Sequence, residues 1–594
     1  MNLSEVDLKK TVNLPQTAFP MKANLPQMEP RMLERWEKEN IYERIRQART
    51  GRPVYVLHDG PPYANGAIHL GTAYNKVLKD FIVKSKSMTG FDAPFVPGWD
   101  CHGLPIEIKV DQQLGARKAQ MSATEIRAEC RKYAARFVDL HRRDFKRLGV
   151  FGRWDDPYLT MSAHYEAVIA QAFVDFLDKG YVYKGLKPVH WCLNCRTALA
   201  EAEVEYENHT SPSIWVRFAL VSDPSAIDPA LAGKTVYGLV WTTTPWTIPA
   251  NMAVAYHPQF EYAAAEAGGD VYIIAAELLK ETQEKCGWPN VRILAKFAGK
   301  RLEDALFRHP FVARDSRGLL AEHVTLDQGT GAVHTAPGHG HEDYLSARQY
   351  GIEVYCPVGP DGRFFHVEGA TGRLPDVLIG KTVWEANPVV IGILKQGEAL
   401  LAQKTIEHSY PHCWRCHKPT IFRATEQWFI GMENHDLRVR ALEAIRQVKW
   451  QPSWGEERIT TMVAARPDWC ISRQRVWGVP ITVFYCQGCQ TPVTDKRILD
   501  RVVELFRRHT ADIWYEKSAE ELLGEGVRCG KCGGSRFRKE SDILDVWFDS
   551  GSSHLAVLDE ANALPWPSDL YVEGPDQYRG WFQSSLLIGV GLRG

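Results

Sequence analysis

The chain has 594 residues, which is too long for a single hydrophobic core, so we expect three or more domains. Its 45% hydrophobic and 24% charged residues are ordinary for a soluble protein, and the net charge of −1 excludes a global basic field. Any contact with RNA must therefore come from local basic clusters such as Lys146 and Arg147, which are otherwise solvated helix faces. The chain has no apolar run of about 18 residues and no export signal over residues 1–10, so we expect a cytoplasmic protein without a membrane partner.

A strand, a loop rich in glycine and proline, and a helix follow one another near the N-terminus. The apolar run 54–57 predicts a buried strand, and 73–86 carries apolar residues at helical spacing. The turn between them holds His69, Gly71 and Thr72. Free backbone N–H groups and the positive end of the helix dipole suit a phosphate there, and His69 can donate to its oxygens. For an isolated H-x-G pattern, an ordinary strand–helix connection is the alternative.

Strands and helices alternate from residue 53 to about 187, as in a doubly wound parallel sheet of an α/β fold. Residues 121–150 predict a long basic helix within this part. Short strands rich in β-branched residues then predict a separate β-rich domain from about 203 to 402. The segment 543–549 predicts a return to the main sheet.

Eight of the thirteen cysteines lie in four C-x-x-C pairs, which in a reducing compartment indicate metal binding. Two such knuckles complete a closed, structural four-cysteine zinc site. The two predicted sets of ligands are Cys192, Cys195, Cys413 and Cys416, and Cys486, Cys489, Cys529 and Cys532. The second set has the spacing of a zinc ribbon. The β-rich segment splits the first set, so spacing alone leaves reduced structural cysteines equally open, and His412 and His417 are spare ligands or face solvent.

The stretch His-Asp-Gly-Pro-Pro-Tyr-Ala-Asn-Gly-Ala-Ile-His-Leu-Gly-Thr over 58–72 resembles the H-I-G-H signature of class I aminoacyl-tRNA synthetases, in its isoleucyl form. The resemblance implies that His69, Gly71 and Thr72 are catalytic residues that bind ATP. Thr72 stands where the family has a second histidine. Its hydroxyl can hydrogen-bond a phosphate or ribose oxygen, but it cannot carry a positive charge.

Three further blocks resemble the same family. Asp100 resembles the amino-group anchor of the substrate, although a loop-capping aspartate is the simpler interpretation. In block 571–581, the resemblance implies that Glu573 binds the adenylate and that Gln577 contacts the carboxylate side. It also implies an isoleucine pocket walled by Pro61, Pro62, Trp547 and Trp581, whereas such aromatic residues by themselves more often form core. In block 466–480, Arg473 and Arg475 either face ATP or the tRNA end or form ion pairs on the surface.

The resemblance also implies a limit on amino-acid selectivity. Isoleucine differs from valine by one methylene, which an apolar pocket can use for only about 1–3 kcal/mol of discrimination, so a second, hydrolytic site is expected. Two motifs of the β-rich segment fit it, and the resemblance implies the editing residues Thr242, Thr243, Thr244, Asn251 and His334, with Asp343 holding the amino group. A triple threonine alone is only a good strand, and His334 alone is more often a satisfied core histidine.

The resemblance covers essentially the whole chain and implies a Rossmann-type sheet split by a β-rich editing insertion and a zinc-ribbon insertion. The predicted parts are an arm (1–50), the first half of the catalytic domain (51–190), the editing domain (191–416), a return to the catalytic domain (417–480), the zinc ribbon (481–540) and the second half of the catalytic domain (541–594). The implied function is ATP-dependent activation of isoleucine and its transfer to tRNA(Ile), with hydrolytic editing of valine. The implied ligands are structural Zn²⁺ at one or two sites and ATP with Mg²⁺, and we expect a monomer.

The family's second ATP signature, Lys-Met-Ser-Lys-Ser, and its anticodon-binding domain do not occur in this sequence. We therefore expect a truncated chain with very weak adenylation, because no mobile lysine loop stabilises the leaving pyrophosphate. Its insertion could still deacylate Val-tRNA. Three alternatives stay open: an editing-only tRNA deacylase, a non-enzymatic zinc-dependent RNA-binding module, and a valyl-type relative.

Overall fold

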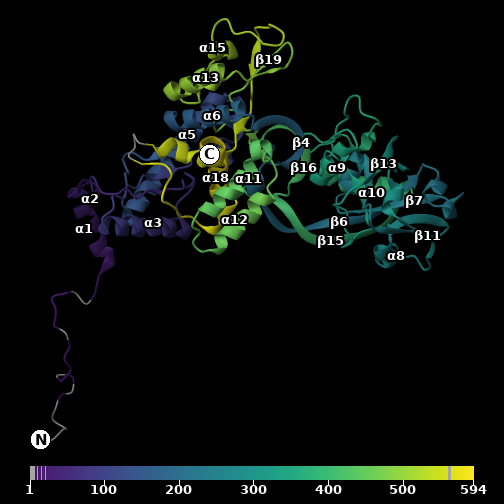
Figure 1. Cartoon of the computed structure of the whole chain (residues 1–594), viewed down its shortest axis with the longest axis horizontal. Helices are drawn as coiled ribbons and strands as arrows, with labels where there is room; N and C mark the ends of the chain where they lie inside the picture. The colour runs from purple at the N-terminus through teal and green to yellow at the C-terminus, as the bar shows by residue number, and fades with distance from the viewer. Residues whose placement is uncertain (1–6, 8, 10, 15, 20–21, 560–563) are drawn as a thin grey trace. The chain divides into compact units, whose positions relative to one another are not determined.

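The computed structural model describes the chain except for residues 1–6, 8, 10, 15, 20, 21 and 560–563 (Figure 1). The chain forms two compact units. The first unit consists of Met1–Cys101, Arg131–Leu159 and His554–Gly574, and the second unit of His102–Cys130, Thr160–Ser553 and Pro575–Gly594. Most of segment 1–10, where an export signal was sought, lies outside the described residues. No helix of the described part is long and apolar enough to cross a membrane.

The first unit contains two parallel strand pairs that join segments far apart in the sequence. Strand β1 (Leu57–His58) pairs with β23 (Leu570–Tyr571), and β2 (Gly98–Trp99) pairs with β3 (Tyr158–Leu159). Parallel pairing requires long crossover connections, which is the arrangement predicted for a doubly wound α/β sheet. The strands are short, however, and the strand predicted from residue 54 begins only at Leu57.

Helices α3 (Leu70–Met88) and α5 (Ala123–Arg147) confirm the helices predicted over 73–86 and 121–150. Two further helices, α1 (Leu25–Lys38) and α2 (Ile41–Ala48), lie in the N-terminal arm. Within the first unit, Lys146 pairs with Glu37 and Arg147 with Glu29. These acidic partners neutralise part of the basic cluster, as expected for an ion-paired, solvated helix face.

The buried face of α3 differs from the apolar face that the sequence suggested. Lys76, Lys79, Asp80 and Val83 are buried, whereas Phe81 is 63% exposed. The two lysines are drawn inward because they form ion pairs with a buried aspartate, and the apolar pattern could not reveal this.

The second unit is built on a four-stranded sheet in the order β17-β16-β4-β5. Its strands are β4 (Val182–Cys192), β5 (Thr197–Leu199), β16 (Ile421–Ile430) and β17 (Trp469–Cys470). The helices of this part are α4 (Leu104–Leu114), α6 (Ala163–Asp178), α11 (Leu437–Gln447), α12 (Trp454–Ala464), α16 (Val546–Gly551) and α18 (Trp581–Arg593). Helix α17 (Ser553–Val557) belongs to the first unit except for its first residue. β4 and β16 pair antiparallel, so the chain leaves this sheet and returns to it at neighbouring positions.

Two long antiparallel strands, β6 (Val204–Leu220) and β15 (Leu400–Cys413), carry the chain into and out of the predicted β-rich segment (Figure 1). They belong to a ten-stranded sheet in which β15 pairs with β6 beside the order β11-β9-β10-β7-β6-β12-β13-β8-β14. The other strands are β7 (Val236–Thr242), β8 (Ala253–Tyr256), β9 (Glu261–Ala267), β10 (Asp270–Ala275), β11 (Arg292–Ala298), β12 (Leu306–Arg308), β13 (Asp315–Leu320) and β14 (Ala332–Thr335). Helices α7 (Pro224–Ile227), α8 (Leu279–Cys286), α9 (His341–Gln349) and α10 (Val383–Gln396) accompany the sheet, as a β-rich domain with a few helices predicts.

The cysteine-bearing segment near the C-terminus folds around a small sheet in the order β20-β19-β21. Its elements are β19 (Phe484–Cys486), β20 (Pro492–Val493), β21 (Phe537–Lys539), α13 (Lys496–His509), α14 (Ile513–Glu516) and α15 (Ala519–Leu523).

The chain then forms β22 (Ile543–Leu544), which pairs antiparallel with β18 (Ser472–Arg473). The strand predicted through residue 549 is wrong beyond Leu544, because the side chain of Asp545 accepts the N–H of Trp547 and starts α16.

Candidate functional site

His69 caps the N-terminus of α3 in the first unit. Its Nδ1 atom accepts the backbone N–H of Thr72 at 3.3 Å, so one of the free helix donors is already satisfied by this side chain. A Cβ at Gly71 would lie 3.0 Å from the His69 ring, so the lack of a side chain at Gly71 leaves room for the ring. His69 and Gly71 are both exposed, and the remaining N–H groups of the first turn keep the character of an anion site.

Asp100 follows β2 directly and lies beside the proline-containing loop. The backbone N–H of Asp100 donates to the carbonyl of Pro62 at 3.0 Å, and the N–H of Ala64 donates to the carbonyl of Asp100 at 2.9 Å. The residue is 2% exposed. The structure therefore brings the predicted Asp100 and the Pro61–Pro62 loop together at the carboxyl end of a parallel strand, the usual ligand-binding edge of such a sheet.

Glu573 is held by a buried network that the sequence did not reveal. Its carboxylate accepts from Lys79 Nζ at 2.5 Å and from Asn75 Nδ2 at 3.1 Å. Lys79 Nζ also donates to Asp59 at 2.7 Å, and Lys76 pairs with the same aspartate. The sequence shows several charged residues along α3, but only the fold shows that the side chains of Lys76 and Lys79 point inward.

Burial and neighbouring charges shift the pKa values of this network in opposite directions. Burial lowers the pKa of Lys76 to about 8, against the attraction of Asp59. Burial also acts to lower the pKa of Lys79, but the charges of Asp59 and Glu573 outweigh it, so that the pKa is raised. Burial raises the pKa of Glu573, and Lys79 opposes this. Lys79 therefore stays charged between the two carboxylates and helps to keep Glu573 ionised.

The other predicted pocket residues lie in the second unit, and three of them are close together. The backbone N–H of Trp581 donates to Gln577 Oε1 at 3.1 Å. A Cβ at Gly580 would lie 2.6 Å from the Trp547 ring and 3.0 Å from Gln577 Oε1, so glycine lets the indole approach the chain.

The two indoles differ in their surroundings. Trp581 is 3% exposed and donates its indole N–H to the carbonyl of Ser550, which is the behaviour of a core residue. The indole N–H of Trp547 is buried and has no hydrogen-bond partner among the described residues. Because an unmade hydrogen bond costs about 1–3 kcal/mol, Trp547 is the stronger candidate for contact with a bound molecule or water.

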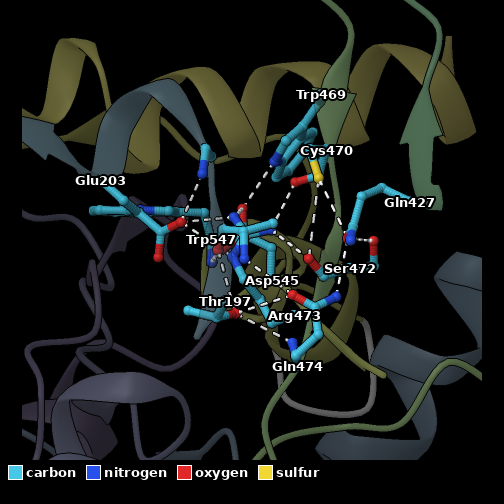
Figure 2. Close-up of polar contacts among 12 residues, drawn as sticks. Thr197, Glu203, Gln427, Trp469, Cys470, Ser472, Arg473, Gln474, Asp545 and Trp547 are labelled. Carbon is cyan, nitrogen blue, oxygen red and sulfur yellow. Dashed lines mark hydrogen bonds and ion pairs between the residues drawn. The ribbon is translucent and has the colours of Figure 1, made fainter. Parts of the chain in front are cut away.

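Arg473 is buried, so of the two predicted alternatives an ion pair on the surface is wrong for this residue. Its guanidinium contacts Glu203 at 2.7 Å and Asp545 at 3.1 Å, and it donates to two backbone carbonyls (Figure 2). Burial acts to lower its pKa, but Asp545 and Glu203 raise it above the ordinary value, so the group remains a cation. Within the second unit Arg473 therefore has a structural ion network, and Arg475 beside it is half-buried.

Four of the predicted editing residues lie together in the β-rich sheet. Thr242, at the end of β7, contacts the hydroxyl of Thr244 at 3.1 Å. His334 on β14 contacts Asn251 Nδ2 through its Nδ1 atom at 3.4 Å. The link between these pairs is Thr247, whose hydroxyl lies 3.2 Å from Thr244 Oγ1 and 2.8 Å from His334 Nε2.

Sequence reasoning missed Thr247 and Ser316. Thr247 stands three positions after Thr244 in a short 3-10 turn, and this spacing was a signal available in the sequence. Ser316 donates to Asn251 Oδ1 at 2.5 Å from a different strand, β13, and no local pattern points to it. Thr243 is half-buried beside this row.

Burial shifts the pKa values of His334 and Asp343 in opposite directions. It lowers the pKa of His334 to about 4, so its imidazole is neutral at pH 7. Burial raises the pKa of Asp343 to about 6, although the carboxylate accepts the N–H of Ala336 at 2.8 Å. Asp343 thus lies against the loop that follows His334, at the first turn of α9. A neutral imidazole with hydroxyl and amide neighbours can orient water, and a nearby carboxylate can hold an ammonium.

Both predicted cysteine sets gather into clusters. In each set the four sulfur atoms lie within 4.8 Å of one another. We call Cys192, Cys195, Cys413 and Cys416 the first cluster, and Cys486, Cys489, Cys529 and Cys532 the second cluster. Sulfurs of opposite knuckles approach to 3.5 Å in the first cluster and to 3.4 and 3.5 Å in the second. A disulfide would need about 2.05 Å, whereas Zn–S bonds of about 2.3 Å in a tetrahedron place sulfurs roughly 3.8 Å apart.

The donor set and its geometry fit Zn²⁺ at both clusters. The ends of the β-rich segment also meet at the first cluster, as predicted. His412 is buried with Nδ1 2.8 Å from the carbonyl of Tyr410, and His417 is exposed beside Glu205 and Glu207. Neither histidine is part of the first cluster, which consists of four cysteines.

The fold agrees with that expected for a class I tRNA synthetase: it has parallel strand pairs, a helix N-terminus suited to an anion, a β-rich insertion and two cysteine clusters. The family model for class I tRNA synthetases (I, L, M and V) matches residues 31–594, and the chain belongs to this family.

Among curated proteins, the chain is 55% identical over 589 residues to an isoleucine–tRNA ligase of Geobacter sulfurreducens, covering 99% of this chain and 63% of that protein. It is 52% identical over 588 residues to one of Syntrophotalea carbinolica, with the same coverage. The chain thus spans about 63% of the length of these relatives. A solved ternary complex of LeuRS, tRNA and LeuAMS from Agrobacterium radiobacter aligns with 96% of this chain and 65% of its own, at 16% identity and a TM-score of 0.41.

Proposed function

We propose that the protein activates isoleucine with ATP, transfers it to tRNA(Ile) and hydrolyses misattached valine. The observation that carries this proposal is the 55% identity to an isoleucine–tRNA ligase across 99% of the chain. Family membership alone would leave the isoleucyl, leucyl, methionyl and valyl activities open. The amino acid, ATP with Mg²⁺ and tRNA(Ile) are the proposed ligands, and the proposed molecule is a monomer.

In the synthetic reaction, the first turn of α3 with His69 would bind the phosphates of ATP through backbone N–H groups. Asp100 would hold the ammonium of isoleucine, and Glu573 would bind the adenylate. Gln577 and Trp547 would contact the amino acid. These groups position reactants and stabilise charge, and they form no covalent bond with the substrate.

In the editing reaction, Asp343 would hold the ammonium of the valyl ester. His334, whose ring nitrogens contact Thr247 and Asn251, would hold these two residues in place beside the ester. The hydroxyls of Thr242, Thr243 and Thr244 would orient the attacking water and donate to the oxygen that becomes negative. The proximity of Thr244, Thr247, His334 and Asn251 supports this assignment.

Zn²⁺ at both cysteine clusters is proposed as structural, because all four ligand positions are filled by thiolates and none is left for water. When bound, the ion supplies a crosslink and no acid–base chemistry. The cysteines of the first cluster would fasten the two ends of the β-rich segment, and those of the second would hold the knuckles around β19.

The test measures two reactions on one zinc-loaded preparation of the chain. Hydrolysis of Val-tRNA(Ile) should be faster than that of Ile-tRNA(Ile). ATP–pyrophosphate exchange, which we expect to be very weak in this chain, should respond to isoleucine more than to valine or leucine. His334→Ala should abolish hydrolysis alone, and Asp100→Asn should abolish exchange alone. Equal hydrolysis of both esters, or exchange that prefers valine, contradicts the isoleucyl assignment.

An editing-only tRNA deacylase is the second candidate. It is favoured by one observation: the editing residues all belong to the second unit, whereas the proposed synthetic residues are divided between both units. Hydrolysis of Val-tRNA(Ile) by a chain that binds neither isoleucine nor ATP supports this candidate over the synthetase.

A further inference from the structure

Trp414 lies inside the second knuckle of the first cluster, between Cys413 and Cys416. Its ring centroid is 5.9 Å from that of Trp547, at an interplanar angle of 32°. The guanidinium of Arg415 covers Trp414 at 3.6 Å from the ring centroid. A residue fixed between two metal-ligating cysteines therefore contacts the indole that the proposed pocket needs.

A second route joins the same two places through charged groups. The backbone N–H of Trp414 donates to the carbonyl of Glu203 at 3.1 Å, and the carboxylate of Glu203 accepts the Arg473 guanidinium at 2.7 and 3.1 Å. Arg473 in turn lies 3.1 Å from Asp545. Figure 2 shows Glu203, Arg473 and Asp545 close together.

Asp545 is the last step of this route, because it starts the helix that carries Trp547. One oxygen accepts the backbone N–H of Trp547 at 3.2 Å, and the other accepts the indole N–H of Trp469 at 2.8 Å. Asp545 is fully buried, so its position is fixed by these partners and by Arg473. Movement of Arg473 would leave a buried carboxylate at the N-terminus of α16 without its cation.

We propose that the first cluster positions Trp547, through Trp414 on the ring side and through Glu203, Arg473 and Asp545 on the backbone side. All of these residues belong to the second unit. Zn²⁺ at the first cluster would then tune the shape of the isoleucine pocket, in addition to fastening the β-rich segment. The positioning stands on the contacts alone, and only its consequence for isoleucine rests on the proposed function.

The indole of Trp547 can report its own position. The full chain is labelled with 5-fluorotryptophan, and the ¹⁹F signal that disappears in Trp547→Phe is assigned to Trp547. In Trp414→Phe, which keeps all eight cysteines, the Trp547 signal should shift by more than its linewidth. Arg473→Lys keeps the charge but loses the planar fork, and it should shift the same signal. Chelation of zinc from the first cluster should do so as well.

The matched control is the second cluster, which also consists of four cysteines and contributes none of the contacts described above. Cys489→Ser should leave the Trp547 signal in place, whereas Cys416→Ser should move it. If Trp414→Phe and Arg473→Lys both fold, as judged by an otherwise unchanged ¹⁹F spectrum, and neither moves the signal, the inference is wrong. Equal shifts in Cys416→Ser and Cys489→Ser also overturn it, because a general loss of structure would then explain both.

The link to isoleucine is read separately. Isoleucine added to the wild-type chain should move the Trp547 signal, and the dissociation constant from this titration should rise about tenfold in Trp414→Phe, equal to about 1.4 kcal/mol. If the variants move the signal but isoleucine does not, the positioning holds and the pocket assignment of the proposed function fails. If isoleucine moves the signal while the variants leave it unchanged, the proposed function holds and the positioning fails.

Discussion

The Nε2 atom of His334 lies 2.8 Å from the hydroxyl oxygen of Thr247, and this contact joins β14 to the turn after β7. His334 is neutral at pH 7, so the hydroxyl decides which nitrogen of its ring carries the proton. The same hydroxyl lies 2.8 Å from the carbonyl of Thr244, to which it can donate. Thr247 then accepts from Nε2, which leaves Nδ1 as the acceptor toward Asn251.

Replacing Thr247 should therefore weaken editing without unfolding the sheet. Thr247→Val keeps the shape but removes the partner of His334, and hydrolysis of Val-tRNA(Ile) should fall by about tenfold to hundredfold, or roughly 1.4–2.8 kcal/mol. Thr247→Ser restores the hydroxyl and should keep most of the activity. Single-turnover deacylation measures both, and undiminished hydrolysis by Thr247→Val would show that the contact has no part in the reaction.

The pH dependence of editing should follow Asp343. Burial raises its pKa to about 6, so the carboxylate that would hold the ammonium is ionised at pH 7 and protonated below pH 6. Hydrolysis of Val-tRNA(Ile) at subsaturating substrate should fall as the pH decreases through about 6, mainly through weaker binding. Asp343→Asn should be slow at every pH and should lack this step. A pH profile of the wild-type chain that stays flat between pH 7 and 5 contradicts the role of Asp343.

Lys79 should be one of the most important side chains for the stability of the first unit. It lies between the carboxylates of Asp59 and Glu573 with no exposed surface, so Lys79→Met leaves two buried carboxylates without this partner. The expected loss of unfolding free energy is about 3–5 kcal/mol. Lys146→Met, which breaks the exposed pair with Glu37 in the same unit, should cost less than about 1 kcal/mol. Urea unfolding compares the two, and equal losses would refute the structural weight given to burial.

Because of His102, the second unit should become less stable as the pH rises into the alkaline range. Its ring nitrogens lie 3.1 Å from Asp549 and 3.2 Å from Glu166, and all three side chains are buried. Burial acts to lower its pKa, but the hydrogen bonds and charges of the two carboxylates raise it to about 9. The folded state thus binds this proton more tightly than the unfolded state, whose histidine has a pKa of about 6.5.

The resulting stabilisation is fully present below about pH 6.5 and is lost as the pH rises through about 9. A shift of this size corresponds to roughly 3 kcal/mol. Urea unfolding of the second unit, followed at pH 6.5, 7.5 and 9, should show a falling midpoint in the wild-type chain and a flatter course in His102→Gln. A wild-type midpoint that rises over this range would mean that His102 is neutral in the folded state.

The predicted motifs located the helix start at His69, both cysteine clusters and the two strands of the editing constellation. These features depend on residues close together in the chain, where spacing determines whether side chains share a turn or a knuckle. The H-x-G turn needs only a strand, a glycine and a helix, and C-x-x-C needs only a tight turn. The first cluster was harder, because its knuckles are separated by the whole β-rich segment, and the antiparallel pairing of β6 with β15 brings them together.

The residue pattern by itself determined the family, the α/β architecture with its insertion, and most of the candidate site residues. Tertiary structure alone decided that Lys76 and Lys79 face inward, that Thr247 and Ser316 join the proposed editing residues, and that Arg473 is buried between two carboxylates. The physical reason is that buried ion pairs and hydrogen bonds join segments hundreds of residues apart, as Lys79 and Glu573 show. The spacing of apolar residues indicates which face of a helix is buried. It does not indicate which charged side chains form ion pairs in the interior.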